Sequence, residues 1–122
     1  MGNICLCLRH AFGFRVRAAL RTVDGKIYQG CNVENASYGG AICAERTAFV
    51  KAVSEGHLRF VAIAAACDYN HYSAPCGIYR QFMNEFGKNL EIFCVNDDMT
   101  YKRVVLADFL PYAFGPEDLP AK

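Results

Sequence analysis

The sequence predicts a single α/β domain in which a β-hairpin is followed by strands alternating with helices. Three observations predict it: a strand-like alternation ending at a hairpin turn signal, a continuous apolar run of strand length, and two helical patterns that each end at a glycine. The 122 residues fit one domain. With 53% hydrophobic and 20% charged residues, the composition is that of a globular protein rather than a disordered one.

The hairpin is predicted from the alternation along Phe14–Thr22. Apolar residues occupy positions 14, 16, 18 and 20, while three arginines share the opposite face. Asp24-Gly25 is a hairpin turn signal, so Lys26–Val33 is predicted to return as the antiparallel partner strand.

A loop and the first helix come next. Glu34–Gly40 contains two glycines and small polar residues, which is typical of a loop. The apolar spacing then predicts a helix over Ile42–Glu55, ended by Gly56. The apolar run Phe60–Cys67 has strand length and predicts a strand covered on both faces.

The second half repeats the alternation with shorter elements. A polar loop over Asp68–Pro75 precedes a helix that is closed by Gly87. The remaining predicted elements are a helix over Gly77–Phe86, strands over Glu91–Val95 and Tyr101–Leu106, a helical turn over Ala107–Leu110 and an extended tail over Pro111–Lys122.

Charge and hydropathy exclude several function classes. Thirteen basic and twelve acidic residues leave a net charge of +1, which argues against a nucleic-acid binder, so the arginines of the first strand are interpreted as a solvated face. No apolar run reaches the roughly 18 residues of a membrane span, and no charged start followed by a long apolar stretch suggests a signal peptide. We therefore expect a soluble, cytoplasmic protein that contacts neither nucleic acid nor membrane.

Seven cysteines call for a chemical explanation. The odd count without an export signal makes a disulfide framework a poor explanation, which leaves metal ligation, catalysis or burial. Cys43 and Cys76 stand at the predicted starts of the two helices, where free amide groups and the helix dipole favour a thiolate. Two such thiolates could share a zinc ion, and Glu45 could reach a zinc-activated water. That arrangement suits metal-assisted hydrolysis.

The order of several segments resembles the small, free-nucleoside, zinc-dependent cytidine deaminases. The matching segments are CNVENASY at 31–38, ICAERTA at 42–48, PCG at 75–77 followed by Arg80-Gln81, Leu110-Pro111 and FGP at 114–116. The resemblance covers about residues 14–119 and implies a three-layer α/β/α sandwich around a mixed five-stranded sheet. It also implies Zn²⁺ as cofactor and a homotetramer that acts in pyrimidine salvage.

The resemblance implies roles for individual residues. Cys43 and Cys76 match zinc ligands, Glu45 matches the proton shuttle, and Arg46 matches an arginine that tempers the charge of the thiolates. The positions that match substrate-binding residues are Phe14, Asn32, Glu34, Tyr38, Ala44 and Phe114, some of these aromatics being supplied by a neighbouring subunit.

Two features depart from the family pattern. Tyr79 occupies the position of the third zinc cysteine; His71 in the preceding loop is an alternative ligand, although a lone loop histidine is more often a surface residue. Residues 1–13 do not resemble the family's first helix, so we expect a divergent segment followed by the domain at 14–122.

Because of Tyr79, three hypotheses are open: a working cytidine deaminase, an impaired homologue that keeps a binding or oligomer role, and a deaminase of polynucleotides. The balanced charge disfavours the last.

Overall fold

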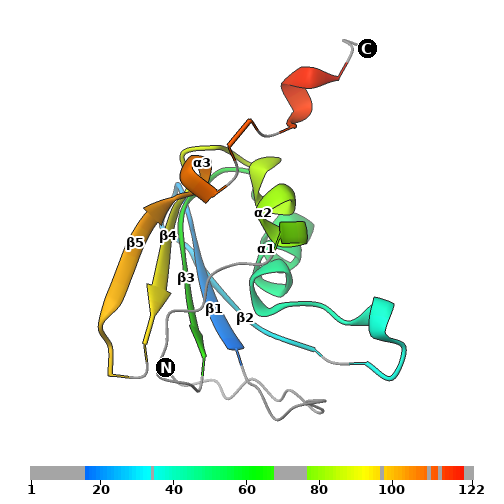
Figure 1. The fold of residues 1–122 in the computed structure, drawn as a ribbon, viewed down its shortest axis with the longest axis vertical. Helices are drawn as coiled ribbons and strands as arrows, with labels where there is room; N and C mark the ends of the chain where they lie inside the picture. The colour runs from blue at the N-terminus through cyan, green and yellow to red at the C-terminus, as the bar shows by residue number, and fades with distance from the viewer. Residues whose placement is uncertain are drawn as a thin grey trace.

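The computed structural model describes residues 16–33, 35–67, 77–96, 98–109, 111–112 and 114–119. Within them, five strands form one mixed sheet in the order β2-β1-β3-β4-β5 (Figure 1). The strands are β1 (Val16–Thr22), β2 (Ile27–Cys31), β3 (Phe60–Cys67), β4 (Glu91–Val95) and β5 (Tyr101–Val105). β3 and β4 are parallel, and every other neighbouring pair is antiparallel. The predicted α/β class with a mixed five-stranded sheet is confirmed.

Helices α1 (Ala44–Ser54) and α2 (Gly77–Asn84) lie on one face of this sheet (Figure 1). α2 belongs to the crossover from β3 to β4, which a parallel strand pair requires. The four-residue helix α3 (Leu106–Phe109) lies beside α2 and the end of β5. Two of the three predicted layers are thus found in the described part of the chain. No helix described there is long and apolar enough to cross a membrane.

α1 packs closely on the sheet because its inner side consists of small residues. Ala44, Ala48 and Ala52 repeat every four residues, which places them on one side of the helix, and all three are fully buried. The helix ends at Ser54 with Glu55 as its C-cap, and Gly56 follows with φ +95°, the left-handed conformation that glycine adopts without strain.

An aromatic cluster joins α1 to α2 and the start of β3. The ring of Phe49 is fully buried, and its centroid lies 5.0 Å from that of Phe60, 5.9 Å from Phe82 and 5.3 Å from Phe86. Two of these contacts are edge-to-face and one is stacked, arrangements that aromatic pairs favour. The cluster fixes the position of α2 relative to α1.

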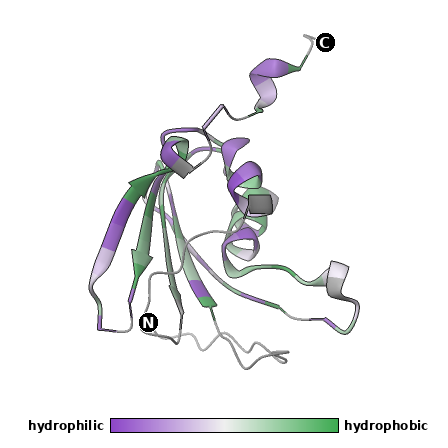
Figure 2. Ribbon diagram, viewed as in Figure 1, coloured by the Kyte–Doolittle hydropathy of each residue, from purple (hydrophilic) through white to green (hydrophobic). Residues whose placement is uncertain are grey.

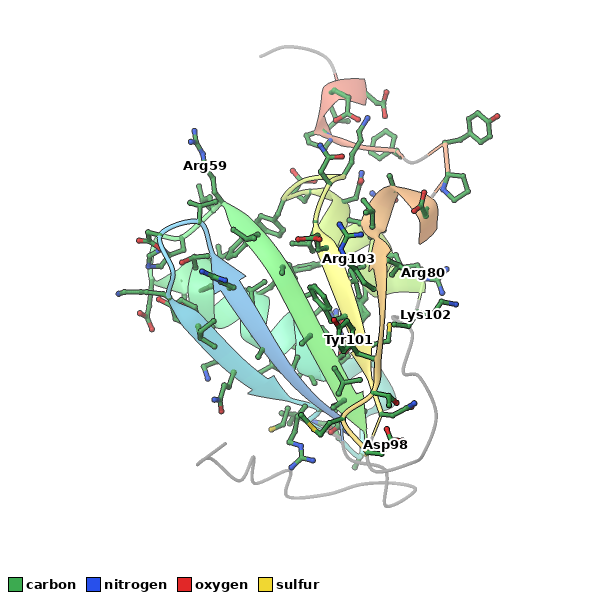
Figure 3. The ribbon with its side chains drawn as sticks, turned by 90° about the vertical axis from the view of Figure 1, so that its left-hand side faces the viewer. Arg59, Arg80, Asp98, Tyr101, Lys102 and Arg103 are labelled. Atoms are coloured by element: carbon green, nitrogen blue, oxygen red, sulfur yellow. The ribbon has the colours of Figure 1, made fainter. Side chains whose placement is uncertain are left out.

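The opposite face of the sheet, which faces the viewer in Figure 3, carries no described helix. Its central row reads Gln29, Ala19, Ala64, Phe93 and Arg103, and none of these residues is buried. The edge strand β5 is hydrophilic over much of its length, whereas β3 is hydrophobic (Figure 2). The expectation that Phe60–Cys67 is covered on both faces is not met within the described residues, since Val61 is 39% exposed.

Several predicted boundaries shift by one or two residues for identifiable reasons. β2 ends at Cys31 because the next residue, Asn32, turns its side chain back to β1. α2 ends at Asn84, and a tighter bond from the Phe86 N–H to the Met83 carbonyl closes its last turn.

The predicted extended tail is corrected at one place. A 3₁₀ turn, η2 (Pro116–Asp118), lies within it. Gly115 enters the turn in an extended conformation and its N–H donates to the Asp118 carboxylate over 2.8 Å, so a capping interaction stabilises the turn.

Candidate active site

The site begins at Cys43, which precedes α1 as its N-cap residue. Its backbone is extended, with φ −77° and ψ 159°, and its side chain is half-buried and forms no capping hydrogen bond. The Cys43 carbonyl instead accepts from the N–H and the hydroxyl of Thr47, each over 3.0 Å. Because the thiol is not used as a cap, it remains available as a ligand at a helix N-terminus.

A short backbone bridge fixes this thiol against the segment after β2. The Val33 N–H donates to the Ile42 carbonyl over 2.8 Å, and the Ile42 N–H donates back over 2.9 Å. The predicted sugar-binding segment and the predicted zinc ligand are therefore held side by side.

Asn32, next to this bridge, is buried and links two strands. Its Oδ1 accepts from the Val16 N–H over 3.0 Å, which ties the end of β2 to the start of β1.

Glu45 lies in the first turn of α1, two residues after Cys43. Only 7% of its surface is exposed, and its Oε1 has no hydrogen-bond partner. Burial raises the pKa of the Glu45 carboxyl above its ordinary value, an effect that the nearby Tyr79 hydroxyl partly offsets. A buried carboxyl with an unpaired oxygen is equipped to exchange protons with a molecule bound beside it.

Tyr79, in the first turn of α2, faces the same place from the neighbouring helix. It is 1% exposed, and its hydroxyl lies near the Glu45 carboxyl and the Cys43 thiol without a hydrogen bond of normal geometry to either. Burial, together with these two acidic neighbours, raises the pKa of Tyr79 far above that of an exposed tyrosine. The structure thus brings the predicted zinc ligand Cys43, the predicted proton shuttle Glu45 and the third metal position, Tyr79, together.

Other predicted residues are placed less directly at the site. Ala44 is fully buried in the first turn of α1. Arg46 donates through Nη2 to the Ala41 carbonyl over 3.1 Å, and its buried Nε has no partner. The backbone of Tyr38 forms the 3₁₀ turn η1 (Tyr38–Gly40).

Phe114 is not brought to the site by its own chain. Its carbonyl accepts from Gln81 over 2.7 Å and from Asn84 over 3.0 Å, which fixes it beside the last turn of α2, whereas Tyr79 lies in the first. Its side chain is 55% exposed. This position does not support a role for Phe114 in the described site of its own chain.

Phe14, Glu34 and Cys76 lie outside the described residues, as does the alternative ligand His71. Among the residues that are described, no three His, Cys, Asp or Glu side chains form a metal-binding cluster. The described site therefore consists of one thiol, one carboxyl and one phenol.

Comparison with known proteins identifies the family. The family model described as "Cytidine and deoxycytidylate deaminase zinc-binding region" matches residues 7–95. The chain belongs to this family. A probable cytidine deaminase of Dictyostelium discoideum is 50% identical over 110 residues, which are 89% of this chain and 74% of the relative. The cytidine deaminase of Sporosarcina psychrophila is 44% identical over 107 residues, 87% of this chain and 79% of that one.

Solved structures of this deaminase family share the fold. The crystal structure of the cytidine deaminase of Burkholderia pseudomallei superimposes with a TM-score of 0.82 at 44% identity, covering 87% of this chain and 86% of that chain. The cytidine deaminase of Mycobacterium tuberculosis gives a TM-score of 0.73 at 36% identity, covering 86% and 82%. The predicted family, its enzyme class of zinc-dependent deaminases and its cofactor are confirmed by these matches.

The described side chains of this deaminase fit a zinc ion. Zinc binds sulfur and oxygen donors, and the site offers the Cys43 thiol beside the buried hydroxyl of Tyr79, which has no hydrogen-bond partner. Buried polar atoms without partners are rare because they cost free energy. A cation between them would remove that cost.

Sequence reasoning missed Gly30 of β2, on which the first turn of α1 rests. A Cβ built at Gly30 would overlap the Ala44 carbonyl oxygen and lie 2.6 Å from the Ala48 nitrogen. The signal was present, because a glycine within a strand often marks the close approach of another backbone.

We expect Gly30→Ala to lower the free energy of unfolding by about 1–3 kcal/mol, since the added methyl group pushes α1 from the sheet. The same displacement moves Cys43 and Glu45, so kcat for deamination should fall as well. Urea denaturation and steady-state kinetics measure the two effects. Gly39→Ala is the matched control because its Cβ would meet nothing within 4 Å. Equal stability of the two variants would contradict the packing argument.

Proposed function

We propose that this chain hydrolyses cytidine and deoxycytidine to uridine and deoxyuridine, releasing ammonia. One observation carries the proposal: Glu45 is buried beside Cys43 with an unpartnered oxygen, at the position that the family resemblance assigns to proton transfer. Support comes from relatives named cytidine deaminase that are 38–50% identical over 87–89% of this chain.

In the proposed reaction, Glu45 moves the protons. It takes one from the attacking water and passes protons to the ring nitrogen and to the departing amino group, so that water and cytidine give uridine and ammonia. Zinc, when bound, supplies a water molecule whose pKa is lowered to about 7. Burial of Glu45 keeps bulk water from its carboxyl, so the proton is exchanged with the bound substrate.

The remaining residues of the proposed site bind and orient. Cys43 and Cys76 would hold the metal, and Arg46 would temper the charge of the thiolates. Asn32 and Glu34 would contact the ribose as donor and acceptor. Phe14, Tyr38, Ala44 and Phe114 complete the substrate-binding set that the family resemblance supplies.

The setting of the enzyme is part of the proposal. We assign the domain to residues 14–122 and expect a cytoplasmic homotetramer that serves pyrimidine salvage. The exposed position of Phe114 supports the tetramer, since a neighbouring copy is the one that could use this side chain.

The test is zinc per chain by elemental analysis, measured beside the loss of cytidine absorbance in the ultraviolet. We expect about one zinc per chain and release of one ammonia for each cytidine lost. Folded protein that contains zinc but leaves cytidine and deoxycytidine unchanged would refute the proposal. Folded protein with neither zinc nor turnover would instead identify an impaired homologue whose role lies in binding.

A further inference from the structure

The phenol of Tyr79 is the least expected group in this site. The family resemblance places a thiolate at this position, and a tyrosine there would usually be a packing residue. Tyr79 does pack within the core, yet its hydroxyl is enclosed without a hydrogen-bond partner among the described residues. Packing alone gives no reason to enclose a hydroxyl, because burying one without a hydrogen bond costs free energy.

The groups around this hydroxyl are acidic or thiol groups. Its neighbours are the Glu45 carboxyl and the Cys43 thiol, which come from the other helix. Among the described residues Glu45 has no ion-pair partner, and the Nη2 of nearby Arg46 is used by the Ala41 carbonyl. Three groups that can each carry negative charge therefore converge, and none of them takes part in an ion pair among the described residues.

A divalent cation accounts for this convergence. Metal ions deprotonate the ligands they bind and reverse the pKa shifts that burial alone produces. A tyrosine oxygen is an established protein ligand, as in the tyrosine that holds the haem iron of catalase. Oxygen donors satisfy zinc, although thiolates bind it more strongly at comparable sites.

We propose that Tyr79 binds the catalytic zinc through its phenol oxygen, as a protein ligand beside Cys43. This assignment rests on the proposed function, because it places the metal at that site. In this assignment the Tyr79 phenolate replaces the thiolate that the family resemblance places at this position, so the chain still has a metal centre. The Glu45 carboxyl remains unligated for proton transfer.

The decisive measurement is spectroscopic and needs no variant. Titrating zinc into metal-free protein should produce the near-ultraviolet difference spectrum of one tyrosinate for each zinc bound. Zinc that binds without this spectrum would overturn the assignment.

Variants give the second readout, zinc affinity measured by competition with a chromophoric chelator. Tyr79→Phe should weaken zinc binding by at least about 100-fold, since even outer-shell partners of a metal contribute 10- to 100-fold. Tyr79→Cys should strengthen it, because a thiolate replaces the phenolate. Tyr28→Phe is the matched control: Tyr28 is buried too, but its hydroxyl donates to Glu55 over 2.9 Å, and its loss should leave zinc affinity and the tyrosinate signal unchanged.

The outcomes separate this inference from the proposed function. If Tyr79→Phe binds zinc as tightly as the unmodified protein, Tyr79 is not a ligand, whatever the activity. If zinc binds with the tyrosinate signal but neither the unmodified protein nor Tyr79→Cys deaminates cytidine, the ligand assignment stands and the proposed function fails. If only Tyr79→Cys binds zinc and turns over, the ligand assignment fails and the site itself is a deaminase site.

Discussion

Glu45→Gln is expected to lower kcat by about 10²- to 10⁴-fold, the usual contribution of a general acid–base group. Glutamine has nearly the same shape, so the buried position is filled as before, but an amide cannot take a proton from water. Zinc content should not change, because Glu45 is not assigned as a ligand. The ultraviolet cytidine assay and elemental analysis of the same preparation measure both quantities.

Glu85→Gln is the control for this experiment. Glu85 is exposed after the last turn of α2 and takes no part in the described site, so its variant should retain full activity. A Glu45→Gln protein that kept its rate would remove this carboxyl from the mechanism. Loss of zinc together with the rate would mean that Glu45 holds the metal rather than the proton.

Phe49→Ala should lower the free energy of unfolding by about 3–5 kcal/mol, a large part of the roughly 5–15 kcal/mol of a typical domain. The reason is its central place among Phe60, Phe82 and Phe86, where truncation leaves a cavity that three aromatic rings border. Urea denaturation followed by circular dichroism gives the value.

Val50→Ala, one residue along the same helix, should change stability by less than about 0.5 kcal/mol because Val50 is 43% exposed. If Phe49→Ala does not fold, Phe49→Leu should fold and show a smaller loss in the free energy of unfolding. A Phe49 variant as stable as the Val50 control would show that the aromatic cluster is not a central part of the core.

Much of the fold could be predicted from local patterns. The bounds of Phe60–Cys67 and Glu91–Val95 agree with the structure because apolar runs of strand length have few alternatives. The end of β2 could not be predicted, since it depends on Asn32 bonding to Val16, sixteen residues earlier. The turn after Gly115 was missed because a proline-rich tail reads as extended unless the capping of Asp118 is known.

The site divides in the same way. The spacing of Cys43 and Glu45 placed both at the start of α1, where the structure has them. The burial of Tyr79 against Glu45 depends on how two helices pack, which the spacing of residues within each helix does not specify. The role of Gly30 could not be predicted in the same way, because it lies in the contact between β2 and α1.

The two hydrogen bonds between Val33 and Ile42 make a single mechanical unit of the backbone beside Asn32 and the backbone beside Cys43. In the proposed function, the segment of Asn32 binds the sugar and the segment of Cys43 binds the metal. A bound nucleoside that orders the backbone beside Asn32 would therefore also order the backbone beside Cys43. By thermodynamic linkage, whatever factor the nucleoside adds to zinc affinity, zinc adds equally to nucleoside affinity.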